Sequence, residues 1–203
     1  MLQICTIAPD TLELLKKLQS ISELADTRLV GGTALAFHLG HRLSIDLDFF
    51  GHFDTETITD TLRSEAFDSF SILVDGKAIK HYLINQVKVD IVEYHRYKWL
   101  EDVIIDDQIR IAGLKDIAAM KIAAITNRGS RKDFIDLFFL LKIFSIKKII
   151  EFYQMKYDDA DVFFAILSLT YFADADNQIM PKMLIPTSWE DVKKSIITEV
   201  KKL

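Results

Sequence analysis

The chain has very little cysteine and no long hydrophobic run free of charge. Its one cysteine, Cys5, has no partner for an internal disulfide and no metal-ligand spacing around it. The N-terminus lacks a basic segment followed by an apolar one, and the most apolar stretch, 134–150, is interrupted by acidic and basic side chains. These absences exclude a disulfide framework and predict neither a signal peptide nor a membrane span. We therefore expect a cytoplasmic protein that does not enter a membrane.

An excess of positive charge is also absent. The chain has 25 Lys and Arg against 30 Asp and Glu, a formal net charge of -5. A uniformly basic surface for nucleic acid is thereby excluded, although a local cleft can still bind one. Internal repeats and low-complexity linkers are absent, and 203 residues, half of them hydrophobic, are enough for one well-cored domain.

The stretch 29–50, LVGGTALAFHLGHRLSIDLDFF, organises the rest of the sequence. A short apolar strand breaks at Gly31 and Gly32, and a helix is predicted over 33–39. A strand that turns on glycines into a helix leaves free backbone N–H groups at the helix N-terminus, where they can hold a phosphate. A plain tight turn is the alternative for a lone glycine pair.

Two acids follow on the next predicted strand, 44–49, where apolar and polar residues alternate. Asp46 and Asp48 then share one face about 7 Å apart, while Ile45 and Leu47 face the other side. Two such carboxylates repel each other unless a cation lies between them or water screens them. The pair is therefore a candidate metal site.

Asp90 is a third acid, on a strand predicted over 87–94. A lone acid among β-branched residues is costly to bury unless something pairs with it. Lys88 or another cation can supply a structural partner. If this strand lies beside the Asp46 strand, Asp90 instead becomes the third carboxylate of a metal site.

The other elements divide the chain into a mixed-sheet half, 1–112, and a helical half, 113–203. In the first half, further helices are predicted over 11–24, capped by Asp10, and over 55–66, with further strands over 28–30, 70–74, 78–84 and 109–112. The second half is predicted to contain helices over 114–128, from near 131, over 162–172 and from 188 onward, with a loop over 173–186. The almost wholly apolar 162–172 is typical of a helix inside a bundle core.

Charged residues of the helical half are further candidates. Lys121 and Arg128 lie two turns apart on one helix face, where they can contact successive phosphates. Ser130 and Asp133 fit a capping box, and Lys132 can pair with Asp136 four residues on. Capping and surface pairing explain this spacing about as well as a catalytic role does.

These motifs resemble a known family. The glycine turn followed by paired acids is similar to the nucleotidyltransferase superfamily signature. More narrowly, VGGTALAFHLGHRLSIDLDFF, KVDIVEY, LKDIAAMKIAAITNR and SRKDFIDL, in this order, resemble the AbiEii/AbiGii toxin family, to which the MenT toxins are related. The resemblance covers nearly the whole chain. It implies an α+β fold: a nucleotidyltransferase-like mixed β-sheet with flanking helices, followed by a C-terminal helical bundle.

The resemblance also implies roles for individual residues. Asp46, Asp48 and Asp90 match the acids that hold Mg²⁺ (or Mn²⁺), and the implied catalytic set adds Lys121 and Asp133. The implied binding set for the nucleoside triphosphate is Gly31, Gly32, Thr33, Ser44, Arg128 and Lys132. The superfamily has serine as the second residue of the turn, where this chain has Gly32, which leaves open whether the Thr33 hydroxyl replaces it.

The implied activity is transfer of a nucleoside monophosphate from a nucleoside triphosphate to an acceptor hydroxyl. RNA, tRNA included, is the expected acceptor, and the protein would be the toxin of a toxin–antitoxin pair with a cognate antitoxin as partner. Two alternatives stay open. One is a catalytically silent relative that binds a nucleotide or a partner. The other is a transferase acting on a small molecule or a protein.

Overall fold

One mixed β-sheet forms the centre of the protein, for which we describe a computed structural model over residues 2–203. Within those residues, seven strands lie in the order β3-β4-β5-β2-β1-β7-β6. They are β1 (Thr27–Val30), β2 (Leu47–Gly51), β3 (Phe70–Asp75), β4 (Ile79–Ile84), β5 (Val87–Glu93), β6 (Ile104–Asp106) and β7 (Ile109–Ile111).

The pairing of these strands is mixed in direction. The middle strand β2 runs antiparallel to β1 and parallel to β5, while β7 runs parallel to β1. β3, β4 and β5 form an antiparallel meander, as the turn signals predict. Its second turn places Asn85 and Gln86 in the left-handed region, at φ 49° and 64°. The meander brings Asp90 onto the strand next to Asp48.

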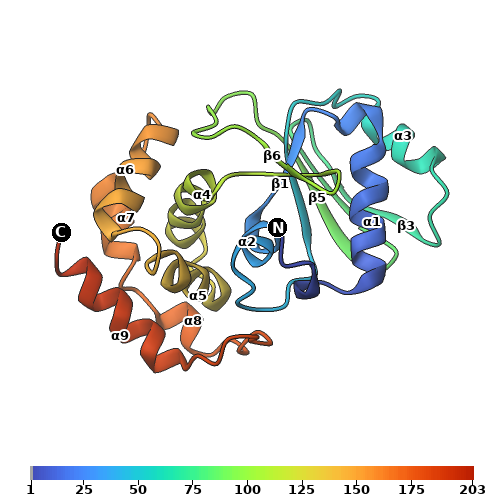
Figure 1. Ribbon diagram of the computed structural model, residues 1–203. Coiled ribbons are helices and arrows are strands. Elements are labelled where there is room, and N and C mark those ends of the chain that lie inside the picture. Colours follow the sequence, from blue (N-terminus) through green and yellow to red (C-terminus); the bar gives the residue numbers. More distant parts are fainter. Residues whose placement is uncertain (1) are drawn as a thin grey trace.

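Helices cover both faces of the sheet and then continue as a helical layer (Figure 1). α1 lies on one face, and α2 and α4 lie on the other, with α5 to α9 beyond α4. The helices are α1 (Pro9–Ser20), α2 (Gly31–Leu39), α3 (Ile58–Ser64), α4 (Leu114–Asn127), α5 (Arg131–Leu140), α6 (Ile146–Lys156), α7 (Val162–Ser168), α8 (Ala173–Asp176) and α9 (Trp189–Val200). Between residues 2 and 203, no helix has both the length and the apolarity needed to cross a membrane.

The hydrophobic core explains this layering. Leu47 and Phe49 are fully buried on one face of β2, and Leu15 and Leu18 of α1 are equally buried. α4 is buried along most of its length because it contacts α2, α5, α6 and α7. The α+β class predicted from the sequence is confirmed. The polar face of β2 is turned toward α4.

The strand predicted over 44–49 is shorter than expected. β2 begins at Leu47, so Ser44 and Asp46 lie in the segment before it, and Ile45 is 67% exposed rather than facing the core. The backbone N–H of Ser44 bonds to Thr6 instead of a neighbouring strand, which breaks the alternation. The capping role predicted for Asp10 is also wrong, because α1 begins at Pro9 and its N-cap is Ala8.

The apolar segment 162–172 is not a helix inside a bundle core. α7 ends at Ser168, and Phe163, Phe164, Leu167 and Tyr171 are all more than half exposed. Only Ala165, Leu169 and Phe172 of this segment are buried. The loop predicted over 173–186 contains the short helix α8, and the sequence prediction missed β6. Composition alone could not show which side of α7 lacks a neighbour.

A buried ion pair ties the helical layer to the loop before it. The Lys156 Nζ lies 2.6 Å from Asp116 Oδ1, and both side chains are fully buried. Asp116 also accepts hydrogen bonds from the backbone N–H groups of Leu100 and Glu101, at 2.9 and 3.0 Å. The Lys156 ammonium lies 4.5 Å from the centre of the Trp99 ring, where a cation is attracted to the aromatic face.

We expect Lys156→Met to destabilise the protein by about 3–5 kcal/mol, because it leaves the Asp116 carboxylate buried without its cation. Urea denaturation followed by circular dichroism measures this change. The control is Lys148→Met, which removes an exposed pair with Glu151 and should cost at most about 1 kcal/mol. Equal losses in the two variants would contradict the importance of the buried pair.

Candidate active site

The glycine turn lies against two charged side chains. Gly31 follows β1 at φ 70°, a conformation that favours glycine. A Cβ at Gly31 would collide with Asp48 Oδ2, and a Cβ at Gly32 would collide with Arg42 Nη2. Position 31 therefore needs glycine for its backbone and for the room that Asp48 takes, and Gly32 lies against the guanidinium of Arg42. The turn leads directly into α2, whose first N–H groups have no partner within the helix.

Thr33 and Ser44 support this turn from behind. The Thr33 hydroxyl lies 2.8 Å from Ser44 Oγ and also donates to the backbone carbonyl of Asp46. Thr33 is 1% exposed, so its hydroxyl holds the segment before β2 in place and does not face the pocket. Ser44 does line the pocket that this turn shares with Asp46 and Asp48. The missing serine of the turn is therefore not replaced by the Thr33 hydroxyl.

Asp48 and Asp90 are direct neighbours in the sheet, paired in register across the parallel strands β2 and β5. With Asp46 they line a pocket of about 290 Å³, which we call the acid pocket. Burial, and after it the charge of Asp90, raise the pKa of Asp48 to about 6. From the sequence, a place for Asp90 beside the paired acids depended on its strand lying next to theirs. The structure confirms that β5 lies next to β2.

Cations already contact two of the three acids. Asp90 accepts hydrogen bonds from His81 Nδ1 at 2.7 Å and from Lys88 Nζ at 2.6 Å. The Lys132 Nζ lies 3.6 Å from Asp46 Oδ2. Among residues 2–203, no group of three or more His, Cys, Asp or Glu side chains is arranged to hold a metal ion by itself. Asp90 thus pairs with Lys88, as the sequence suggested. It also lies beside Asp48, as the metal-site hypothesis requires.

Asp133 and Asp136 hold the cations on the opposite wall. The Lys121 Nζ lies 3.0 Å from Asp133 and 2.6 Å from Asp136, and Arg128 Nε lies 2.9 Å from Asp133. Burial opposes the charge on Asp133, but Lys121 and Arg128 outweigh it and lower the pKa of this carboxyl. Burial likewise opposes the charge on Lys121, whose pKa is nevertheless raised by Asp136 and Asp133. Both ends of each pair are therefore ionised.

The pairing predicted between Lys132 and Asp136 is wrong. Asp136 is fully buried and accepts hydrogen bonds from Arg42 Nε and Nη2, at 2.8 and 2.9 Å, and from His41 Nε2 at 2.8 Å. Lys132 is half exposed and turns to Asp46. Ser130 does precede α5, but its hydroxyl donates to the Asp133 carboxylate at 2.6 Å instead of capping the helix backbone.

Arg42 and His81 are site residues that the sequence reasoning missed. Arg42 lines the acid pocket beside Gly32, and its partner Asp136 is 94 residues away in the sequence. His81 lies opposite Asp90 on β4. A histidine-arginine pair directly after a helix-ending glycine is the local signal for Arg42. For His81, the signal is a polar residue at the register position opposite an acid.

An apolar pocket of about 350 Å³ adjoins the acid pocket. The two share Asp48, Asp90, Lys121 and Arg128. The apolar walls come from the sheet and from α4, through Val30, Phe50, Ile79, Val92, Ile117, Met120, Ala123 and Ala124. Asn127 and Tyr157 add polar groups. Together the two pockets suit a ligand with a strongly charged part and a flat apolar part.

The candidate residues thus gather at one place from both halves of the chain. Gly31, Gly32, Ser44, Asp46, Asp48 and Asp90 come from the sheet half, and Lys121, Arg128, Lys132 and Asp133 come from α4, α5 and the turn between them. The carboxylate oxygens of Asp48 and Asp90 are the donors that Mg²⁺ prefers, and Mg²⁺ commonly binds one or two carboxylates together with substrate phosphates. The donor set therefore fits a magnesium ion that is shared with a phosphorylated ligand.

Comparison with known proteins points to one family. The family described as "Nucleotidyl transferase AbiEii toxin, Type IV TA system" matches residues 13–201. An uncharacterised protein of Aquifex aeolicus, aq_aa25, is 36% identical over 205 residues, covering 93% of each chain.

Solved structures share the fold. JHP933 from Helicobacter pylori has a TM-score of 0.59 at 20% identity, covering 97% of this chain and 92% of its own. MenT4, a nucleotidyltransferase toxin from Mycobacterium tuberculosis, has a TM-score of 0.58 at 15% identity, covering 95% of this chain and 85% of its own. The match over almost the whole sequence shows that the chain belongs to the nucleotidyl transferase AbiEii toxin family of type IV toxin–antitoxin systems.

Proposed function

We propose that this protein is a Mg²⁺-dependent nucleotidyltransferase that transfers a nucleoside monophosphate from a nucleoside triphosphate to a hydroxyl of RNA, tRNA included. It would act in the cytoplasm as the toxin of a pair with a cognate antitoxin. The observation that carries the proposal is the in-register pair of Asp48 and Asp90 beside the glycine turn. The two adjacent carboxylates can bind a cation, and the backbone N–H groups at the nearby N-terminus of α2 can bind a phosphate.

The triphosphate would lie in the acid pocket. The backbone N–H groups of Gly32 and Thr33 at the start of α2 can donate to its oxygens. Arg128, Lys88 and Lys132 line the same pocket and supply positive charge around them. The base would then occupy the adjoining apolar pocket, between the sheet and α4. Asn127 and Tyr157 there offer hydrogen bonds to its edge.

Mg²⁺ held by Asp48 and Asp90, with Asp46 beside them, would neutralise charge on the phosphates and lower the pKa of the attacking hydroxyl. In the transfer step, the acceptor oxygen bonds to the α-phosphorus. The bond from that phosphorus to pyrophosphate breaks, and pyrophosphate leaves with the electron pair. The hydroxyl proton would pass to Asp90 where its carboxylate is not fully engaged with the ion; without a ligand, this carboxylate accepts hydrogen bonds from His81 and Lys88.

Lys121 would act on the same step through its charge. It lies between Asp133 and Asp136 and lines both pockets. Because Asp133 also binds Arg128, this acid holds both cations toward the place where charge develops on the phosphates. Asp133 is thus assigned a positioning role.

We expect Asp46→Ala, Asp48→Ala and Asp90→Ala each to lower nucleotidyl transfer by about 100-fold or more, because each removes a cation ligand or the proton acceptor. The assay incubates the protein with each α-labelled nucleoside triphosphate, Mg²⁺ and total tRNA, and then separates RNA, protein and small-molecule fractions. Asp60→Ala, at a carboxylate that pairs only with Arg63 on the surface, is the control.

Three outcomes would contradict parts of this proposal. Undiminished transfer by Asp48→Ala would remove the assigned chemistry. Nucleotide binding without Mg²⁺-dependent transfer would indicate a catalytically silent relative. Label in the protein or small-molecule fraction would replace RNA as the acceptor.

Asp48 should also make the metal-free protein less stable as pH rises. Burial and the charge of Asp90 raise the folded-state pKa of Asp48 to about 6, from 3.8. Between about pH 4 and 6 the folded state holds a proton that the unfolded state has lost, so the free energy of unfolding falls across this window. Two pH units correspond to about 3 kcal/mol.

Asp48→Asn should therefore be more stable than the parent at pH 7.5 by up to about 3 kcal/mol, and the difference should vanish near pH 4. Urea denaturation in EDTA at both pH values measures it, with Asp60→Asn as the exposed control. A less stable Asp48→Asn at pH 7.5 would mean that the charged form is well satisfied in the fold.

A further inference from the structure

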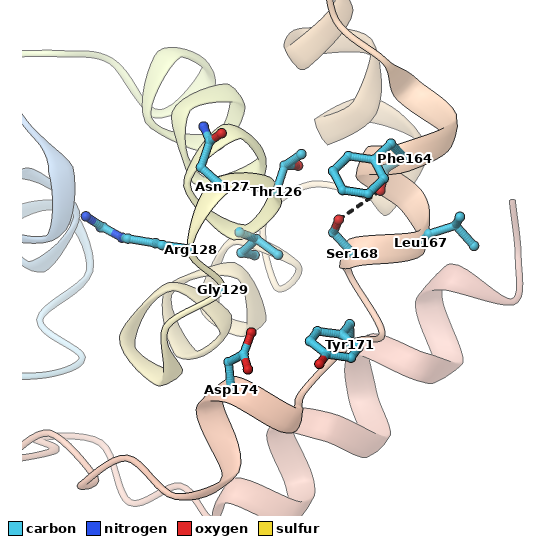
Figure 2. A pocket seen from close by; sticks show the side chains of 10 residues that line it. Thr126, Asn127, Arg128, Gly129, Phe164, Leu167, Ser168, Tyr171 and Asp174 are labelled. Atoms are coloured by element: carbon cyan, nitrogen blue, oxygen red, sulfur yellow. Dashed lines mark hydrogen bonds between the residues drawn. The ribbon is translucent and has the colours of Figure 1, made fainter.

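A further pocket lies between the end of α4 and α7 (Figure 2). Its volume is about 420 Å³, and its walls are residues 125–129, side chains of α7, and residues 171 and 174. We call it the α4–α7 pocket. Neither the proposed triphosphate site nor the proposed base site uses it.

This pocket shares wall residues with the candidate active site. Asn127 and Arg128 line both the α4–α7 pocket and the apolar pocket, and Arg128 also lines the acid pocket. Figure 2 shows the Arg128 side chain pointing away from the α4–α7 pocket, toward the N-terminal part of the chain drawn in blue. A ridge at residues 127–129 therefore separates the two sites, with the guanidinium on the side of the acids. A nucleic-acid strand lying across the ridge would reach both the α4–α7 pocket and the acid pocket.

Exposed aromatic rings form one side of the pocket. Phe164 is 52% exposed and Tyr171 is 59% exposed, and Figure 2 shows both on the α7 side, opposite the end of α4. Large apolar rings left in water favour a ligand that covers them. Aromatic side chains of this kind stack with unpaired bases whatever their sequence.

A carboxylate at the other end limits what the ligand can be. Asp174 projects from α8 toward Gly129 (Figure 2), and its carboxylate makes no hydrogen bond or ion pair within residues 2–203. It can accept hydrogen bonds from a base N–H or a ribose hydroxyl, but it repels a phosphate. A phosphate attached to such a ligand would lie across the ridge, at the Arg128 side chain, which is 66% exposed.

The size of the pocket suits a small ligand such as a nucleoside. Small-ligand sites span about 300–1,000 Å³, which includes this pocket. The hydroxyls of Thr126 and Ser168 already donate to backbone carbonyls, so with the Asp174 carboxylate they offer acceptors, which suit the N–H groups of a base edge better than an apolar helix face.

We propose that the α4–α7 pocket binds an unpaired nucleoside near the 3′ end of the acceptor RNA, stacked against Phe164 and Tyr171. The connecting phosphate lies at Arg128, and the terminal hydroxyl reaches the acid pocket. This inference rests on the proposed function, because it names where that reaction holds its acceptor. The nucleoside triphosphate and the acceptor then approach the acids from opposite sides of the ridge.

The test measures RNA binding separately from transfer. A fluorescently labelled 12-nucleotide single-stranded RNA with a free 3′ hydroxyl is titrated with the full-length protein, and anisotropy is recorded. We expect Phe164→Ala and Tyr171→Ala to weaken binding by about 5- to 100-fold, the loss expected from removing a stacked ring. Nucleoside triphosphate affinity should change by less than about twofold, because neither ring lines the other two pockets.

Phe163→Ala is the matched control, because Phe163 is the preceding residue on α7, is 73% exposed and does not line the pocket. Thermal unfolding by circular dichroism checks that every variant folds. Asp174→Asn should keep binding within about threefold, since an amide oxygen still accepts hydrogen bonds, whereas Asp174→Leu should weaken it further.

Equal RNA affinity of Phe164→Ala and Phe163→Ala, or no RNA binding by the parent protein, would overturn the inference. Unchanged RNA binding together with lost binding of a purified cognate antitoxin would also overturn it and would make the pocket a protein interface. The proposed function and the proposed RNA pocket can be refuted separately. RNA binding that depends on Phe164, without any nucleotide transfer, would refute the proposed function but keep the pocket. Nucleotide transfer with the same KM for RNA in all variants would keep the proposed function but refute the pocket.

Discussion

The structure depends on holding two like charges side by side. Asp48 and Asp90 are adjacent in register on parallel strands, where sheet geometry does not let them move apart. Burial, and after it the charge of Asp90, raise the pKa of Asp48. Lys88 and His81 reduce the repulsion at Asp90, and the glycine at position 31 leaves the room that the Asp48 carboxylate occupies. A cation bound between the two carboxylates, as in the proposed function, would relieve this repulsion.

A second set of acids keeps the opposing cations in place. Asp136 on α5 binds Arg42 from the segment after α2 and Lys121 from α4, while Asp133 binds Lys121 and Arg128. These pairs join the sheet half of the chain to the helical half across the acid pocket. Because breaking a buried pair leaves an uncompensated charge, they also resist separation of the two halves. The ion pairs therefore hold the cationic wall in place without a ligand.

Predictions from the sequence succeeded where the signal was local or where the motifs matched a family. The glycine turn, the meander around Asp75 and Asn85, and the α+β class with its family were all foreseen. They failed where a partner lies far along the chain. Lys132 was assigned to Asp136 by helix spacing, but Arg42, 94 residues away, takes that acid. The apolar 162–172 was assigned to a core, although much of α7 has no neighbour to cover it.

The sequence by itself determined which residues carry charge, where glycine breaks the backbone, and which family the chain belongs to. These features depend on residue type and short spacing, which the chain states directly. Only the tertiary structure decided that Asp48 and Asp90 are in register, that the Thr33 hydroxyl faces Ser44 and not the pocket, and that Arg128 borders three pockets. The reason is physical: register, burial and long-range ion pairs are set by how elements pack, and many packings share one local pattern.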